Sequence, residues 1–312
     1  MIITSLMGGL GNQLFQYAMA KRLAEHHKTE LCLDVSGYGS AGEKRPEGLA
    51  AFRRKVGLFH FRISARAASP DEIIRLRDPF FSKSPQDRLV RIVRRIWPRF
   101  LWRRTHVVER QYRFLSEALQ FPDQIYLQGF WQSEKYFSDI EGIIRQEFEL
   151  RDETVLASAQ QSVQALKEKY GQVVSLHVRR GDLAFAFETL GSPQMVHGTP
   201  VSLEYINKAI SYFDPQTCFF VFSDSANDIE WCKRYIKAER AEFSRAESDV
   251  WDFVAMRHCD HHIIANSTFS WWAAWLDQKA CKKVIAPRVW SSPGARIDMA
   301  IEDLIPASWV VV

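Results

Sequence analysis

The second half of the chain alternates short apolar runs with segments of helical length, and this alternation restricts the fold more than any other feature. The apolar runs lie at residues 173–178, 218–222, 262–265 and 283–286. Segments with helical patterning lie at residues 203–212, 228–236, 250–258 and 271–278. Strands that alternate with helices of this length predict a doubly wound, parallel α/β sheet.

The first third of the chain begins with the same pattern. Strand-like residues 2–6 precede a helical segment at 12–26 and a second apolar run at 30–35. A charged helical segment after Arg151 introduces the second sheet, so we place a domain boundary there. The sequence therefore predicts two Rossmann-like halves, residues 1–150 and 151–312, that face a cleft between them.

The composition is that of an ordinary globular protein: 46% of the 312 residues are hydrophobic and 25% are charged. The five cysteines are scattered and form no C-x-x-C pair, which favours a reducing compartment. The chain opens on a strand-like segment without a basic leader, and it has no run of about 18 apolar residues. We therefore expect a cytoplasmic protein.

Positive charge is concentrated between Ala50 and Arg113, where 17 basic residues face 5 acidic ones, a balance of 17 − 5 = +12. Within it, Arg88 to Arg104 carries seven arginines among apolar residues at helical spacing. This pattern is typical of a helix on an anionic membrane surface. A core-facing apolar stripe with a solvated arginine face explains it equally well. Nucleic-acid binding is less favoured, because no recognised binding motif accompanies the charge.

The apolar run at 173–178 leads directly into the sequence HVRRGD at residues 177–182. Ligands of open α/β sheets bind just beyond the carboxyl ends of strands. The guanidinium groups of Arg179 and Arg180, with His177 and Asp182 beside them, suit a bidentate anion such as a diphosphate. A surface cluster of ion pairs is the alternative reading.

Two more strand ends carry polar groups. Asp224 follows the run at 218–222, and its carboxylate could accept two hydrogen bonds from the N–H edge of a guanine. The run at 262–265 leads into a helix start whose unpaired N–H groups could bind phosphate. The polar residues of this start are Asn266, Ser267, Thr268 and Ser270. Helix capping is the structural alternative at both places.

A glycine-rich turn joins the first strand to the first helix. Gly9 and Gly11 partly match the G-x-G-x-x-G dinucleotide fingerprint, and Asp34 closes the second strand. The third glycine position is Leu14, so the match is weak, but the glycines still predict a backbone that approaches a ligand closely. Asn12 and Gln13 add neutral donors there. A nicotinamide-dependent oxidoreductase is the rival function that this turn suggests.

A metal site is not expected. His258, Asp260, His261 and His262 are clustered in the sequence, but neighbouring positions on a strand point to opposite faces. No D-x-D pair, a common anchor for a cation and a diphosphate, occurs in the chain. Trp271 and Trp275 share one helix face and are interpreted as core residues.

Four blocks of the chain, in this order, resemble the α-1,2-fucosyltransferases. They are GGLGNQLFQY at 8–17, HVRRGD at 177–182, FSDS at 222–225 and ANSTFSWW at 265–272. The resemblance implies a GT-B-like enzyme that transfers L-fucose from GDP-β-L-fucose to the 2-hydroxyl of a terminal β-galactose, with inversion and without a metal or other cofactor.

The resemblance also implies roles for individual residues. Arg179 contacts the β-phosphate of the donor beside His177, and Asp224 contacts the guanine. The resemblance assigns diphosphate contacts to Ser267, Thr268 and Ser270, and a place at the cleft to Asn12. From the residues themselves we expect further donor contacts from Gly9, Gly11, Gln13, Arg180 and Asn266. Asp182, Glu188 and His177 are the candidates for a general base, and departure of the phosphate with the proton would need none.

The acceptor side is less constrained by the sequence. We expect Gln128, Phe130 and Trp131, from an aromatic segment, and Glu188 to bind the acceptor. That acceptor is a β-galactoside glycan or a lipid-linked oligosaccharide for surface polysaccharide or O-antigen. The lipid-linked acceptor would place a bacterial enzyme at the inner face of the plasma membrane.

Overall fold

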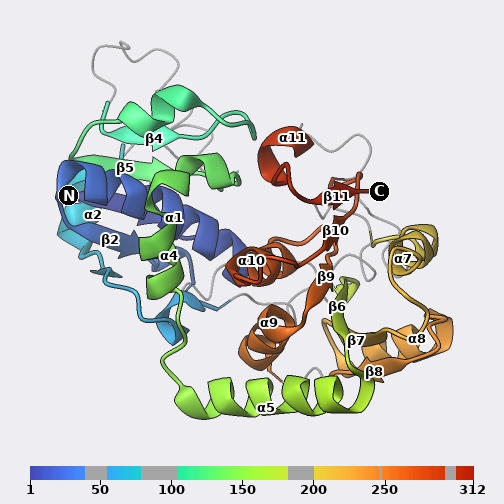
Figure 1. Ribbon diagram of the computed structural model, residues 1–312. Helices are drawn as coiled ribbons and strands as arrows, with labels where there is room; N and C mark the ends of the chain where they lie inside the picture. Colours follow the sequence, from blue (N-terminus) through green and yellow to red (C-terminus); the bar gives the residue numbers. More distant parts are fainter. Residues whose placement is uncertain (39–54, 79–103, 182–199, 246–247, 292–299) are drawn as a thin grey trace.

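The computed structural model describes residues 1–38, 55–78, 104–181, 200–245, 248–291 and 300–312 (Figure 1). Two sheets lie within these ranges, and every strand pairing in both is parallel. The predicted fold class, α/β with two doubly wound halves of the GT-B type, is thereby confirmed. Asp182, Glu188 and nearly all of the segment from Arg88 to Arg104 lie outside the described residues.

The first sheet has the order β3-β2-β1-β5-β4 and belongs to the N-terminal half. Its strands are β1 (Ile2–Ser5), β2 (Leu31–Asp34), β3 (Arg66–Ala67), β4 (His106–Val108) and β5 (Ile125–Gln128). The helices of this half are α1 (Leu10–His27), α2 (Pro70–Leu76) and α4 (Glu141–Glu147).

The second sheet has the order β11-β10-β9-β6-β7-β8. Its strands are β6 (Val173–Val178), β7 (Cys218–Ser223), β8 (Ala241–Phe243), β9 (His261–Ile263), β10 (Val284–Ala286) and β11 (Val310–Val311). The helices are α5 (Glu153–Tyr170), α7 (Leu203–Ile210), α8 (Ala226–Tyr235), α9 (Asp249–His258), α10 (Thr268–Leu276) and α11 (Ile301–Leu304).

Each sheet has one point where the strand order reverses. In the first sheet it lies between β1 and β5, and in the second between β6 and β9. The second sheet, read as the order 3-2-1-4-5-6 of its own strands, has the Rossmann arrangement. Open α/β sheets bind ligands beyond the carboxyl ends of the strands at such points. The topology therefore identifies two strand-end pairs as the places to look for a site.

The two halves share one hydrophobic core instead of meeting only at a surface. Helices α1 and α10 lie side by side in the middle of the molecule (Figure 1). The ring of Phe15 on α1 lies 4.5 Å from that of Trp271 and 4.9 Å from that of Trp272. Both tryptophans are fully buried, so the prediction that the Trp271 face is core is confirmed. Aromatic pairs of this kind add to the hydrophobic stabilisation of the contact.

The end of the chain returns to the N-terminal half. Helix α11 packs there, and the Ser133 hydroxyl donates a 2.6 Å hydrogen bond to the carbonyl oxygen of Asp303. Although all strands of the first sheet precede Arg151 and all strands of the second follow it, the core crosses that boundary. The division into domains 1–150 and 151–312 therefore stays a prediction.

None of the helices in the described ranges combines the length and the apolar character that crossing a bilayer requires.

Candidate functional site

The turn between β1 and α1 is built by close contacts that only glycine permits. Gly8 has a φ of 79°, a left-handed conformation that favours glycine. A Cβ on Gly11 would lie 2.3 Å from the backbone carbonyl carbon of Thr268 at the start of α10. The glycine-rich turn of the N-terminal half therefore touches the backbone of the C-terminal half directly.

Two glutamines of this motif hold the turn from inside. The Gln13 amide nitrogen donates to the carbonyl oxygens of Gly8 (3.2 Å) and Lys55 (2.7 Å), and its oxygen accepts from the Gly57 N–H (2.8 Å). Its side chain is fully buried. The expectation that Gln13 contacts the donor is corrected, because both of its N–H groups bind backbone. Gln16 binds the backbone of Met7 at both ends: its side-chain oxygen accepts from the Met7 N–H (2.9 Å), and its amide nitrogen donates to the Met7 carbonyl oxygen (3.3 Å).

Asn12, in the first turn of α1, connects the ends of three strands. Its side-chain oxygen accepts hydrogen bonds from the Gln132 amide (2.8 Å) and the Thr268 hydroxyl (2.9 Å). Gln132 follows β5 and Thr268 follows β9, so Asn12 bridges the switch points of both sheets. The structure thus brings the predicted residues Asn12 and Thr268 together and adds Gln132, which was not singled out as a donor-site residue.

His177, at the end of β6, lies next to the same helix start. Its Nδ1 is 2.9 Å from the hydroxyl of Ser270, and the ring is buried. Burial lowers the pKa of His177 to about 3, and the neighbouring Arg179 guanidinium lowers it as well. The imidazole is therefore neutral near pH 7, and its low pKa argues against the role of general base.

We expect the free energy of unfolding to decrease as the pH is lowered from about 6.5 to about 4. Burial lowers the pKa of His177 to about 3 and that of His258 to about 4, while an unfolded histidine titrates near 6.5. The unfolded chain thus binds more protons in this window, so stability is lost as the pH falls. Urea unfolding at several pH values measures the slope.

The matched variant for this prediction is His258→Gln, which removes one titrating group outside the candidate site. It should flatten the dependence of stability on pH below 6.5. Asp252, whose pKa burial raises to about 7, acts with the opposite sign, because the folded chain then holds the extra proton. A slope that is unchanged in His258→Gln would contradict the assignment.

The side chain of Arg180 lies against α8. Its guanidinium carbon lies 4.0 Å from the centroid of the Trp231 ring, and its Nε is 3.5 Å from Asp228. Its backbone N–H donates to the carboxylate of Asp224 (2.8 Å). The expectation that both guanidinium groups bind one diphosphate is therefore corrected. Arg180 is buried against α8 beside Asp224, whereas Arg179 is half-buried.

Asp224 lies at the end of β7, adjacent to Gly181. A Cβ on Gly181 would lie 3.0 Å from its carboxylate, so the loop after β6 packs tightly on it. The hydrogen bond from Arg180 fixes the orientation of the carboxylate. Asp224 therefore occupies a defined position at the same sheet edge as Arg179, as the sequence predicted for strands that end side by side.

The start of α10 combines buried polar side chains with a helix N-terminus. Ser267 is the N-cap residue, is buried, and makes no side-chain capping bond, so plain capping does not explain it. The Asn266 amide donates to the carbonyl oxygen of Trp290 (3.2 Å), which gives it a structural contact. The first N–H groups of such a helix lack partners within the helix and can bind an anion.

The residues expected on the acceptor side do not all face one surface. Trp131 is 1% exposed and packs against Phe121 and Tyr136, so its predicted stacking role is corrected. Gln128 is largely buried, with its oxygen 3.0 Å from Nε2 of His106. Phe130 remains half-buried, and its ring lies 6.0 Å from that of Tyr112 at an angle of 30°.

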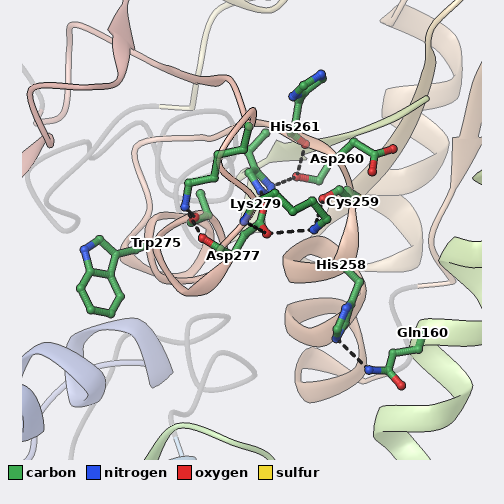
Figure 2. A network of polar contacts seen from close by, with 12 residues as sticks. Gln160, His258, Cys259, Asp260, His261, Trp275, Asp277 and Lys279 are labelled. Carbon is green, nitrogen blue, oxygen red and sulfur yellow. Dashed lines mark hydrogen bonds and ion pairs between the residues drawn. The ribbon is translucent and has the colours of Figure 1, made fainter. Parts of the chain in front are cut away.

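The histidine-rich segment does not assemble into a metal-ligand cluster. Figure 2 shows His258 directed toward Gln160 and away from His261. The buried His262 bridges Ser175 (2.8 Å) and Asp277 (3.0 Å), and Lys279 binds Asp277 as well. Among the described residues, Glu30, Cys32 and Glu72 alone come close enough to share an ion, and there Arg66 binds both glutamates. The metal independence of the reaction stays a prediction.

The structure also weighs against the rival oxidoreductase. Asp34 would have to reach the ribose of a dinucleotide, but it is 2% exposed and accepts a 2.6 Å hydrogen bond from the Tyr126 hydroxyl. Its carboxylate also accepts from the N–H of Ser36 (2.9 Å). Asp34 therefore has a structural role at the end of β2, where both partners of its carboxylate belong to the protein.

The chain is similar over nearly its whole length to bacterial glycosyltransferases. The chain is 28% identical to an α-1,2-colitosyltransferase of Escherichia coli, with 99% of this chain and 98% of the relative covered. It is 27% identical to the O-antigen biosynthesis glycosyltransferase WbnK of Escherichia coli, with 98% of each covered. It is 30% identical to human galactoside α-(1,2)-fucosyltransferase 1 over 48% of this chain and 42% of that protein.

The family model described as glycosyl transferase family 11 matches residues 1–311, which is nearly the whole chain. This confirms the resemblance that the four sequence blocks indicate. The chain belongs to glycosyltransferase family 11.

Proposed function

We propose that this enzyme transfers L-fucose from GDP-β-L-fucose to the 2-hydroxyl of a terminal β-galactose, with inversion at the anomeric carbon and without a metal. One observation carries the proposal: Asn12 and His177 link the strand ends at the switch points of both sheets to a single helix start, that of α10. The names of relatives that transfer fucose or colitose by α-1,2 linkage support the sugar and the linkage.

The donor is recognised through three groups of the C-terminal half. Arg179 binds the β-phosphate, the first N–H groups of α10 bind the diphosphate, and Asp224 binds the guanine. A carboxylate accepts hydrogen bonds from the guanine N1–H and N2–H groups, whereas adenine presents a poorer match. Thr268 and Ser270 lie at the α10 start, where their hydroxyls border the same phosphate groups.

The reaction requires stabilisation of the charge that develops on the leaving group. The acceptor oxygen forms a bond to C1 of fucose while the bond from C1 to the β-phosphate oxygen breaks, and the electron pair stays on that oxygen. A fixed guanidinium at Arg179 and the positive end of α10 stabilise this charge without reorganising. The acceptor proton passes to Asp182, to Glu188 or to the departing phosphate.

The 28% identical colitosyltransferase suggests a second donor. Colitose is fucose without its 3-hydroxyl, so both sugars present the same leaving group and anomeric centre. GDP-colitose is therefore the alternative donor for the same residues and the same mechanism. A hydrogen-bonding group that faces the fucose 3-hydroxyl would separate the two donors.

The acceptor and the location of the enzyme are part of the proposal. We propose a β-galactoside glycan or a lipid-linked oligosaccharide of surface polysaccharide or O-antigen, in keeping with the name of WbnK. A lipid-linked acceptor would bring the enzyme to the inner face of the plasma membrane. The basic segment from Arg88 to Arg104 is the proposed membrane contact.

The test has two stages. GDP should raise the melting temperature of the protein, whereas ADP and NAD should not; stabilisation by NAD alone would rule out the transferase. The protein is then incubated with GDP-fucose or GDP-colitose and a panel of β-galactosides, with and without EDTA. We expect an α-1,2 linkage by NMR and full activity in EDTA. No transfer from either donor to any galactoside would refute the proposed reaction.

A further inference from the structure

The loop from Gly129 to Gln132, between β5 and the next turn, is held in a strained conformation. Trp131 has a φ of 54°, which is unfavourable for a bulky residue. The Glu109 carboxylate accepts hydrogen bonds from the N–H groups of Phe130 (2.6 Å) and Trp131 (3.2 Å). Gly129 has no room for a side chain, because a Cβ there would lie 2.4 Å from Cβ of Glu109.

This strained loop places the amide of Gln132 on Asn12. The amide donates to the side-chain oxygen of Asn12 at 2.8 Å, and the Thr268 hydroxyl donates to the same oxygen at 2.9 Å. A carboxamide oxygen has two lone pairs, so both acceptor positions are occupied. The orientation of the Asn12 side chain is thereby fixed by one donor from each half of the molecule.

The other end of the Asn12 side chain is its NH2 group. Within the part of the chain that the structure describes, no side chain or carbonyl is hydrogen-bonded to this nitrogen. It packs over the glycine turn, where a Cβ on Gly8 would lie 2.4 Å from it. Asn12 is half-buried, so its NH2 group is a fixed donor beside the start of α10.

We infer that Gln132 is a positioning residue for the transfer reaction. It orients Asn12 so that the Asn12 NH2 group donates to the donor diphosphate, and Glu109 supports it by clamping the loop. The inference rests on the proposed function, because it takes the diphosphate to lie at the start of α10. Backbone strain that is maintained by surrounding contacts is typical of functional sites. The strained backbone at Trp131, held by Glu109, therefore supports a functional role for this loop.

A purely structural role would have a different signature. If Gln132 only joined the two halves, its removal would lower the melting temperature and leave kcat unchanged. If it positions Asn12, its removal lowers kcat and weakens GDP binding while the melting temperature changes little. The variants Gln132→Ala, Asn12→Ala and the double variant separate these cases.

We expect kcat/KM for the sugar nucleotide to fall roughly 10- to 100-fold in each single variant, because a small misplacement of the reacting groups costs about that much. The double variant should lose no more than the worse single variant, because Gln132 acts through Asn12. Calorimetric titration with GDP should show the same lack of additivity. The control is Gln164→Ala on the exposed face of α5, which should keep full activity.

Full activity of Gln132→Ala, or losses that multiply in the double variant, would overturn the inference. If the wild-type protein transfers fucose and binds GDP, such a result refutes the role of Gln132 alone. If the wild-type protein neither binds GDP nor transfers sugar, the proposed function and the inference are both wrong. A lower melting temperature with an unchanged kcat in Gln132→Ala would show that Gln132 only stabilises the fold, and this result also overturns the inference.

Discussion

Replacing Arg179 by alanine should abolish turnover and leave the protein folded. Arg179 follows β6 directly and is half-buried beside His177, at the edge where the diphosphate is proposed to bind. In the proposed metal-free reaction, this guanidinium is the main charge that opposes the negative charge of the departing GDP. Loss of one such fixed donor lowers kcat by about 100- to 1,000-fold, and loss of a full positive charge should do at least as much.

The experiment compares steady-state transfer, GDP affinity and melting temperature in three variants. Arg179→Lys keeps the charge but loses the bidentate geometry, so it should fall between wild type and Arg179→Ala. Arg240→Ala removes an arginine from the far edge of the same sheet, at the amino end of β8, and should behave like wild type. If Arg179→Ala keeps nearly normal activity, the assignment of the catalytic site is wrong.

The sequence predicted the parts of the site that depend on strand order. A buried six-residue strand such as β6 is mostly apolar over its length, so the following Arg179 could be placed at its carboxyl end. The same reasoning placed Asp224 after β7 and Thr268 after β9. The strands β3, β4, β8 and β11 escaped prediction, because two or three residues at a sheet edge give no such run.

The errors concern residues whose role depends on contacts distant in the sequence or on backbone conformation. Gln13 looks like an exposed donor at a helix start, but its partners Lys55 and Gly57 come from a separate segment. Trp131, two residues after Gly129, resembles a sugar-stacking residue, and nothing in the local sequence reveals its positive φ. Gln132 meets Asn12 across 120 residues, so no local pattern could have found it.

The shared core changes how the two halves are expected to cooperate. Two separate domains would keep their stability when the contact between them is disturbed. Here Phe15 packs on Trp271 and Trp272, and Asn12 binds Thr268, directly beside the contact between Gly11 and α10. A change at Gly11 should therefore affect stability and catalysis together.

Gly11→Ala should destabilise the whole chain, although alanine favours helices more than glycine does. The new Cβ would lie 2.3 Å from the carbonyl carbon of Thr268 and 2.4 Å from the Phe269 nitrogen, both backbone atoms that cannot rotate away. Overpacking of this kind lowers the free energy of unfolding by about 1–3 kcal/mol or more. Separating α1 from α10 would also disorder the proposed diphosphate site.

The matched control is Gly142→Ala on α4, where an added Cβ meets nothing within 4 Å. There the higher helix propensity of alanine should stabilise the protein by up to about 1 kcal/mol, with no change in kcat. Two glycine-to-alanine changes in helices should therefore shift the urea midpoint in opposite directions. Equal shifts of the two midpoints would mean that the close approach of Gly11 to α10 does not hold the halves together. An active Gly11→Ala variant with a normal midpoint would mean that the site does not depend on this close approach.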